Sequence, residues 1–268
     1  AAVGYNAMAA NIDGGDNTAF GEAALEDNTS SIRNTALGRA SLASITSNSN
    51  RHVAIGYAAL VSLTGGNENT AVGNEAGQAM TTGDSNTIVG SYAGDALTTG
   101  GQNTAIGRAA LSTATTASYN VAVGYKALDQ CTSSENVAVG NNCLKELTTG
   151  ANNVAMGYNC ADAMTTGNYN TAMGVNALTN ATTGERNSAF GSASLENLTT
   201  GQYNTSLGQG SSYQMQGGSY NVAVGHNALY NIYNTDNNTA VGYRAGQTSS
   251  SGTNNTSLGE NAQPSNSS

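Results

Sequence analysis

The residues that most often carry out chemistry are few in this chain and lie far apart. Its 268 residues include two histidines, His52 and His226, and three cysteines, Cys131, Cys143 and Cys160. The spacing of the cysteines matches no zinc motif, and an odd, sparse set is not a disulfide framework. No Ser/His/Asp group, carboxylate pair or metal cluster can be assembled around the histidines. We therefore predict that the protein is not an enzyme and that it needs no cofactor or metal.

Two smaller groups of reactive side chains lead to expectations of their own. Cys143 and Cys160 occupy equivalent places in a repeat, which would bring their α-carbons to about 5 Å, a distance that a disulfide tolerates. Stacked β-carbons seldom take the torsion of a disulfide, so we expect two buried free thiols. The segment Asp13–Asp16 has the carboxylates of a calcium loop, but it occurs once and indicates an ordinary loop.

Tyrosine is the side chain whose repetition points to recognition of a ligand. Exposed Tyr beside Asn and Asp can bind glycans by stacking and hydrogen bonding, whereas the alternative is that the rings stack on one another and cover a corner of the fold. The candidates for contact with a glycan are Tyr125, Tyr158, Tyr169, Tyr203 and Tyr220. We favour the packing role, and the glycan role stays open.

Paired threonines also recur, and regular threonine rows can form an ice-binding plane. Such a plane needs both hydroxyls to point outward, as in Thr-x-Thr on a strand. Adjacent Thr residues followed by Gly, as in Thr98-Thr99-Gly100, instead indicate a turn. Ice binding is therefore the third and weakest of the functional hypotheses.

The elements that position all these residues follow from a strict internal period. The block Asn69-Thr70-Ala71-Val72-Gly73 returns every 17 residues as far as Asn255–Gly259, with one residue added before His52 and one lost between Asn120 and Asn136. The consensus is N-[TV]-A-[apolar]-G-x-x-A-L-x-x-L-T-T-G-x-x. We number its positions from the Asn, which is position 0. A period of this length is typical of a solenoid.

Each position of the repeat has a physical interpretation. Positions 1 to 3 predict a short strand whose large apolar residue faces inward and whose Ala, at position 2, faces the opposite side. The Ala-Leu pair at positions 7 and 8 predicts a second short strand. Glycine at position 4 suits a corner with positive φ, and we expect it at Gly73, Gly90, Gly107, Gly124, Gly140, Gly157 and Gly174. Stacked Asn side chains predict a hydrogen-bonded ladder of Asn69, Asn86, Asn103, Asn120, Asn136, Asn153 and Asn170.

The predicted fold is therefore an all-β, parallel β-solenoid of about sixteen 17-residue coils. It spans residues 1–259, and residues 260–268 form a linker-like tail. One such coil is thin and buries little apolar surface, so we expect the Ala columns to pack closely against identical chains, preferably in a homotrimer.

Composition excludes several classes of partner. The net charge is −9, and the eight Lys and Arg residues are scattered, which argues against binding of nucleic acid. No apolar run is long enough for insertion into a membrane. The sequence begins at Ala1, in the middle of a repeat, from which we expect a piece of a longer protein.

The repeat Asn-Thr-Ala-x-Gly-x-x-Ala-Leu-x-x-x-Thr-Thr-Gly resembles repeats of phage and phage-like tail fibre proteins. In those proteins the repeats precede a self-cleaving intramolecular chaperone, and Ala262–Ser265 is similar to the linker before it. A weaker resemblance is to the heads of trimeric autotransporter adhesins, which are left-handed β-rolls with shorter repeats. The resemblances imply a left-handed, trimeric fold and an extracellular or virion location. They favour a tail fibre shaft or receptor-binding stalk that mediates host attachment, and alternatively a bacterial surface adhesin head.

Overall fold

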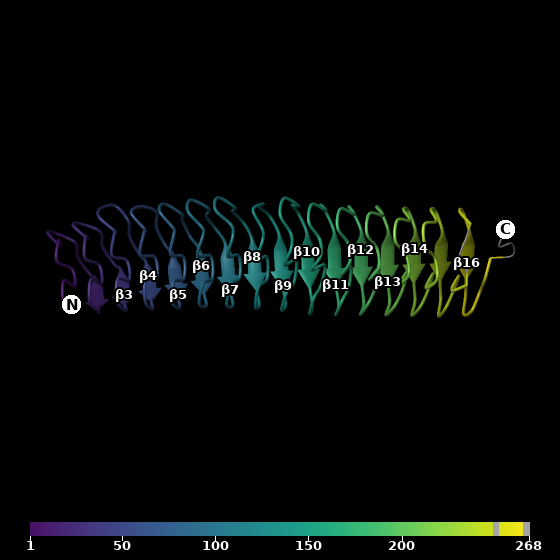
Figure 1. Cartoon of the computed structure of the whole chain (residues 1–268), viewed down its shortest axis with the longest axis horizontal. Helices are drawn as coiled ribbons and strands as arrows, with labels where there is room; N and C mark the ends of the chain where they lie inside the picture. Colours follow the sequence, from purple (N-terminus) through teal and green to yellow (C-terminus); the bar gives the residue numbers. More distant parts are fainter. Residues whose placement is uncertain (249–251, 265–268) are drawn as a thin grey trace. The chain divides into compact units, whose positions relative to one another are not determined.

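The computed structural model describes residues 1–248 and 252–264 and divides the chain into two units, residues 1–135 and 136–268. Residues 265–268 of the expected tail lie outside the described residues. Within the described ranges the only regular elements are short strands, and no helix is present (Figure 1). Accordingly, no helix in this part of the chain is long and apolar enough to cross a membrane.

Each unit is a parallel β-solenoid with one strand per repeat, which confirms the predicted fold class. In the first unit the strands are β1 (Ala2–Val3), β2 (Thr18–Phe20), β3 (Thr35–Leu37), β4 (Val53–Ile55), β5 (Thr70–Val72), β6 (Thr87–Val89), β7 (Thr104–Ile106) and β8 (Val121–Val123). In the second they are β9 (Val137–Val139), β10 (Val154–Met156), β11 (Thr171–Met173), β12 (Ser188–Phe190), β13 (Thr205–Leu207), β14 (Val222–Val224), β15 (Thr239–Val241) and β16 (Thr256–Leu258). Sixteen strands enclose about 15 turns.

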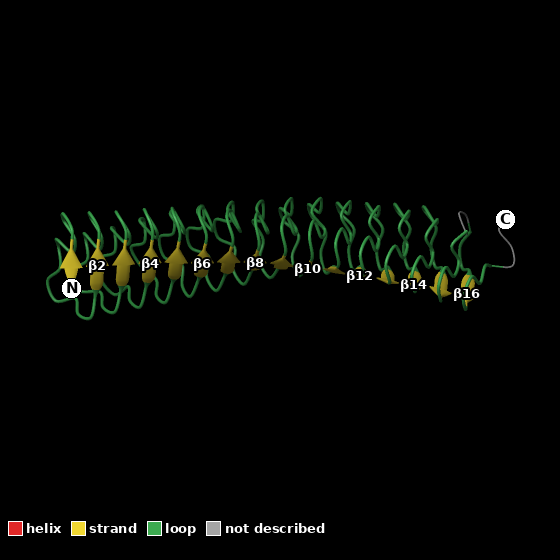
Figure 2. Cartoon of the chain, turned by 90° about the horizontal axis from the view of Figure 1, so that it is seen from below, coloured by secondary structure: helices red, strands yellow, loops and turns green. Residues whose placement is uncertain are grey.

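Equivalent positions of the repeat lie directly beside one another. In the second unit, Val154, Ala155 and Met156 of β10 pair with Thr171, Ala172 and Met173 of β11. The other pairings within each unit keep the same register, and the strands line up one after another in sequence order (Figure 2). Every side-chain type of the repeat therefore forms a column along the unit.

The prediction of which strand side chains face the interior is wrong. Ala at position 2 faces the interior, as for Ala71 and Ala155, which are at most 1% exposed, whereas the large apolar residue at position 3 faces outward. The reason is the period of two along a strand, which places positions 0 and 2 on one side and positions 1 and 3 on the other. Because the Asn of position 0 points inward, the Ala must do so as well. The Ala columns are consequently not free to pack against another chain.

The predicted second strand is also absent. The Ala-Leu segment forms turns in which the residue before Ala and the Leu after it have positive φ, as at Lys126 (54°) and Leu128 (52°). The N–H of Lys126 donates to the carbonyl of Arg108, and the N–H of Leu111 donates to the carbonyl of Ala127. Hydrogen bonds between coils thus persist outside the strands, in a backbone of alternating handedness rather than an extended one.

The core of each unit consists of a few columns of small and medium-sized side chains. Buried Leu at position 8 and a buried apolar residue at position 11, such as Leu128 and Leu147, face the Ala of position 2. In β6, Ile88 takes the place of the Ala at position 2. Position 8 is Gly instead of Leu in this coil (Gly94) and in the one before it (Gly77), and a β-carbon at Gly77 or Gly94 would lie 3.1 or 3.2 Å from Cδ1 of Ile88. The larger side chain therefore fills the space that the missing leucines leave.

Candidate functional site

The histidines, cysteines and carboxylates that could carry out chemistry are scattered over the repeats. No group of three or more His, Cys, Asp or Glu residues that could hold a metal ion occurs in residues 1–248 and 252–264. Cys143 and Cys160 are buried free thiols, and Cys131 is buried as well. The hydrogen bond between the thiols of Cys143 and Cys160, together with burial, raises the pKa of Cys143 well above its usual value. The thiol of Cys143 is therefore protonated and a poor nucleophile.

The Asn column forms a buried ladder of hydrogen bonds in each unit. Nδ2 of Asn187 donates to Oδ1 of Asn170 at 3.2 Å and to the carbonyl of Gly201 at 2.9 Å. Oδ1 of Asn187 accepts hydrogen bonds from the backbone N–H and from Nδ2 of Asn204, both at 3.0 Å. The predicted members Asn69, Asn86, Asn103 and Asn120 in the first unit and Asn136, Asn153 and Asn170 in the second are all buried. Ladder amides with such partners have a structural role and need no ligand.

His52 takes the place of Asn in this column and is fully buried. Its Nδ1 accepts the backbone N–H of Asn69 at 3.1 Å, which is the bond that an Asn Oδ1 accepts elsewhere. Its Nε2 lies 2.9 Å from Oγ of Ser49, so the neutral ring carries its proton on Nε2. Burial lowers the pKa of His52 to about 4. The ring is a neutral part of the ladder near neutral pH, and it is not a free acid or base.

The corner glycines have the positive φ that the repeat indicated. Across Gly73, Gly90, Gly107, Gly124, Gly140, Gly157 and Gly174, φ lies between 135° and 144°. A β-carbon at Gly107 would lie 2.3 Å from the carbonyl oxygen of Gly124. Both the backbone conformation and the close approach of the next coil therefore require glycine.

The five tyrosines that the sequence singles out as candidates for glycan contact are all exposed. They are Tyr125, Tyr158, Tyr169, Tyr203 and Tyr220. Tyr203 and Tyr220 stack on each other with ring centroids 5.0 Å apart, and the guanidinium of Arg186 lies over both Tyr169 and Tyr203, at 5.2 and 5.4 Å. Tyr169, Tyr203 and Tyr220 therefore have features of both alternatives, packing and glycan contact, since their rings pack on neighbours and are still exposed to solvent.

In several threonine pairs, the first hydroxyl bonds to the backbone of the next coil. Oγ1 of Thr98 donates to the carbonyl of Thr115 at 2.8 Å, and Oγ1 of Thr148 donates to the carbonyl of Thr165 at 2.9 Å. The first Thr of a pair thus joins adjacent coils, and the pair does not offer two free hydroxyls to an ice surface.

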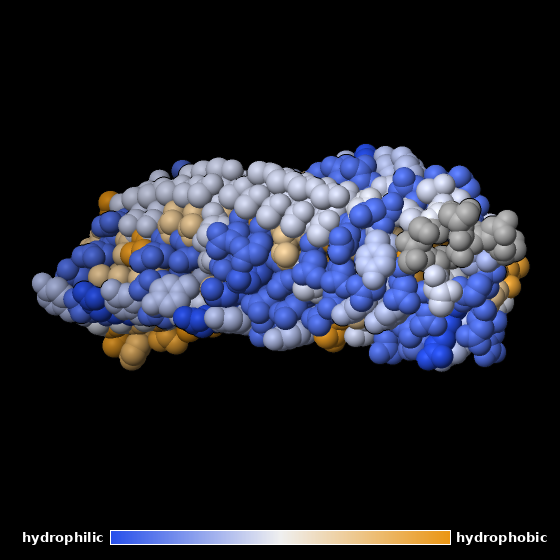
Figure 3. Space-filling view, turned by 45° about the vertical axis from the view of Figure 1, so that its right-hand side comes forward, coloured by the Kyte–Doolittle hydropathy of each residue, from blue (hydrophilic) through white to orange (hydrophobic). Residues whose placement is uncertain are grey.

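The outer side of the strands forms an uncharged face in each unit. Position 1 is Thr, Val, Ser or Ala, and position 3 is a large apolar residue in every repeat. Leu37 is 44% exposed, Met156 41% and Leu207 49%. We call positions 1 and 3 of the strands the outer strand face. In the view of Figure 3, hydrophobic residues lie at the left and in the middle of the lower edge and in smaller patches elsewhere, on a surface that is otherwise mostly hydrophilic.

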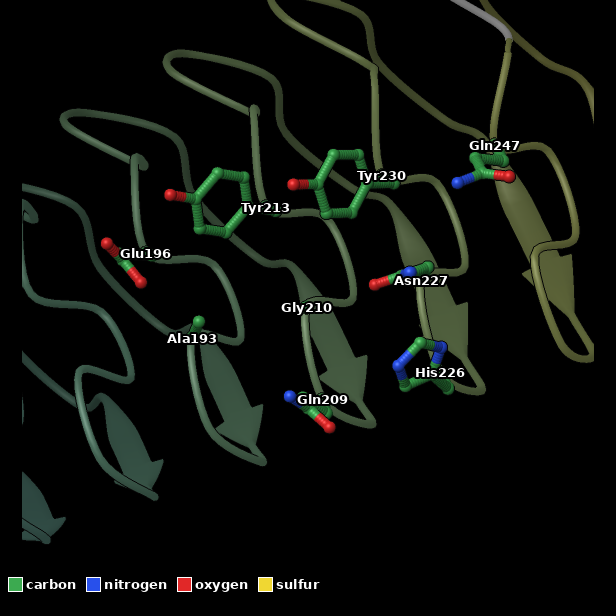
Figure 4. A pocket seen from close by; sticks show the side chains of 9 residues that line it. All are labelled: Ala193, Glu196, Gln209, Gly210, Tyr213, His226, Asn227, Tyr230 and Gln247. Carbon is green, nitrogen blue, oxygen red and sulfur yellow. The ribbon is translucent and has the colours of Figure 1, made fainter.

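A hollow of about 610 Å³ lies on the second unit. One wall consists of Tyr213 and Tyr230, whose rings stack at 5.1 Å with an angle of 11° between their planes. Gln209 and His226 lie across from them, beside the strand ends, and Asn227 lies between the two sides (Figure 4). The hollow therefore has an aromatic side and a side of amide and imidazole groups.

Sequence reasoning missed the tyrosines of this hollow, although a signal was present. Tyr213 and Tyr230 are 17 residues apart at position 9, where no other repeat has an aromatic residue. Their column lies neither directly after the corner glycine nor directly before the Asn, which are the two places where Tyr is frequent. The second signal was Gly210, a glycine at position 6 in a repeat that already has its corner glycine.

Comparison with protein-family models, with curated proteins and with solved structures gives no match.

Proposed function

We propose that this chain is a structural and adhesive segment of a fibre, most consistent with the shaft or receptor-binding stalk of a phage tail fibre that mediates host attachment. The observation that carries the proposal is the outer strand face, which is apolar, uncharged and exposed in both units. The resemblance of the repeat to tail fibre repeats supports the same assignment. On this proposal the protein is extracellular, as part of a virion, and has no catalytic activity.

The proposed assembly is a parallel homotrimer that buries the outer strand face. Exposed apolar surface costs roughly 25 cal/mol per Å² relative to burial, and here it recurs at every coil. Identical chains packed about a cyclic axis place each column against the same column of a neighbour, so one contact geometry repeats along the fibre. The position that we expected to mediate this packing, the Ala of position 2, is replaced by the residues of positions 1 and 3.

Native mass spectrometry and sedimentation at equal protein concentration test the assembly. We expect three chains for the unmodified protein. The double variant Met156→Lys/Leu207→Lys should dissociate, because each substitution places three like charges near the axis of an apolar interface. Gln202→Lys adds a charge at an exposed loop residue and serves as the matched control. A folded, stable monomer of the unmodified chain at micromolar concentration would refute the trimer.

The alternative assignment, a bacterial surface adhesin head, makes the same prediction for assembly but a different one for location. Antibodies against the chain should label purified phage particles if it belongs to a tail fibre. Labelling of bacterial surfaces in the absence of particles would instead favour the adhesin head.

A further inference from the structure

The hollow on the second unit lies where two neighbouring coils carry small residues at position 6, the second of which is the only glycine at that position in the repeats. Position 6 holds Asn in several repeats, among them Asn176 and Asn227, but it is Ala193 and Gly210 in the two coils between them. A β-carbon at Gly210 would lie 2.5 Å from Oδ1 of Asn227 and 3.5 Å from the ring of Tyr230. The absence of a side chain at Gly210 therefore opens the floor beside the tyrosines.

Backbone hydrogen bonds hold the two tyrosines of the hollow in place. The carbonyl of Tyr213 accepts hydrogen bonds from the backbone N–H and the side-chain amide of Asn197, at 3.3 and 2.9 Å. The carbonyl of Tyr230 accepts the N–H of Gln214 at 3.0 Å. Both tyrosines are only half-buried, so their edges and hydroxyls remain available. Such a fixed aromatic wall loses little conformational entropy when a ligand binds.

The polar groups of the hollow are of the kind that recognises hydroxyls. Gln209, Asn227 and Gln247 each provide an amide that can both donate and accept, and His226 provides an imidazole. No Lys or Arg lines the hollow, and its single carboxylate is Glu196. Burial raises the pKa of Glu196, which disfavours its charged form. The lining is therefore suited to a neutral ligand with apolar ring faces and many hydroxyls, not to an anion.

We propose that this hollow binds a neutral oligosaccharide that runs parallel to the axis of the second unit. Sugar rings would contact the wall of Tyr213 and Tyr230 with their C–H faces and edges, and their hydroxyls would bond to the amides of Gln209 and Asn227. Successive coils are about 4.8 Å apart, which is comparable to the length of one pyranose ring. This inference rests on the proposed adhesive function and assigns its ligand class and its site.

Binding of defined oligosaccharides to the full chain tests the proposal. The neutral probes are maltotetraose, cellotetraose and chitotetraose, measured by saturation-transfer NMR and by calorimetry. Sialyllactose and tetralysine are the anionic and cationic comparisons. We expect at least one neutral probe to bind and both charged probes to fail. Failure of all three neutral probes at millimolar concentration, or binding of a charged probe alone, would overturn the proposal.

Two substitutions connect any binding to the hollow. Gly210→Asn fills the floor with the residue that other repeats carry at position 6, and Asn tolerates the positive φ of 62° at this site. Tyr230→Thr removes one ring of the wall. Each should raise the dissociation constant at least tenfold. Tyr220→Thr, which removes an exposed ring elsewhere on the unit, should leave the dissociation constant unchanged. Thermal melts establish that each variant folds, and equal weakening by Tyr220→Thr would contradict the assignment.

The two proposals can fail separately. The hollow lies within one chain, so saccharide binding per chain should survive in the Met156→Lys/Leu207→Lys variant even when the assembly dissociates. A trimer that binds no saccharide overturns the site alone, and a monomer that binds saccharide overturns the assembly alone.

Discussion

The Asn ladder gives the sharpest test of how the solenoid is stabilised. In Asn187→Leu, the carbonyl of Gly201 loses the amide donor at 2.9 Å, and the buried N–H of Asn204 loses its acceptor at 3.0 Å. Oδ1 of Asn170 keeps the backbone N–H of residue 187 and is not orphaned. Two buried groups without partners cost about 1–3 kcal/mol each, so we expect a loss of about 2–6 kcal/mol of unfolding free energy.

Two matched variants separate the ladder from general effects of the substitution. Asn180→Leu makes the same replacement at an exposed residue of the preceding coil and should change the unfolding free energy by less than about 0.5 kcal/mol. Asn187→His imitates the native arrangement at His52, where an imidazole nitrogen accepts the next backbone N–H at 3.1 Å. Asn187→His should therefore lower the unfolding free energy by less than Asn187→Leu does.

Guanidinium unfolding followed by circular dichroism, at one fixed protein concentration, provides the measurement. A fixed concentration is needed because association stabilises the folded chain by mass action. If Asn187→Leu and Asn180→Leu unfold at the same denaturant concentration, the ladder contributes nothing measurable, and the buried hydrogen bonds do not determine the stability of the coils.

Three further predictions concern single positions. The unfolding free energy should fall by about 3 kcal/mol as the pH drops from 6.5 to about 4, because the unfolded histidine takes up its proton before the buried ring of His52 does. His52→Asn should remove this component from the pH dependence of chemical unfolding. Ile88→Ala should cost about 2–4 kcal/mol by leaving a cavity, and adding Gly94→Leu should recover part of that loss in thermal melts, since it restores the common Ala and Leu pair. Gly107→Ala should cost about 3 kcal/mol or more, whereas Gly15→Ala, which has no heavy atom within 4 Å of its β-carbon, should be nearly neutral by the same assay.

The periodic features of the fold could be predicted from the sequence because each coil meets the same constraint. A single 17-residue period gives one strand per repeat and brings equivalent residues together, as Asn170 and Asn187 show. The positive φ at the corner glycines follows from the same repetition. These features depend on local backbone geometry and on stacking, which act in the same way in every coil.

The orientation of the strand was predicted wrongly because hydrophobicity was given more weight than strand parity. Val72 is more apolar than Ala71 and was assigned to the interior, yet it lies on the same side as Thr70 and opposite the buried Asn69. A ladder that buries Asn69 requires the residue two places later to be buried too. The interior is narrow, so the residue there is Ala, and the larger residue is left outside, where only another molecule can cover it.

The hollow could not be predicted from the repeat, because it depends on departures from it. Positions 0, 2 and 4 vary little, since the ladder, the narrow core and the corner permit few side chains, and those positions can hold no ligand specificity. Positions 5, 6 and 9 vary freely, because the coil is held by backbone hydrogen bonds that their side chains do not make, such as those of Tyr213 and Tyr230. A recognition site on a solenoid of this kind should therefore arise where several variable positions of adjacent coils depart together, as Gly210 does beside the two tyrosines. Filling Gly210 with Asn tests this principle as well as the site, since it gives this position a residue that is common there in other repeats and should weaken binding at least tenfold.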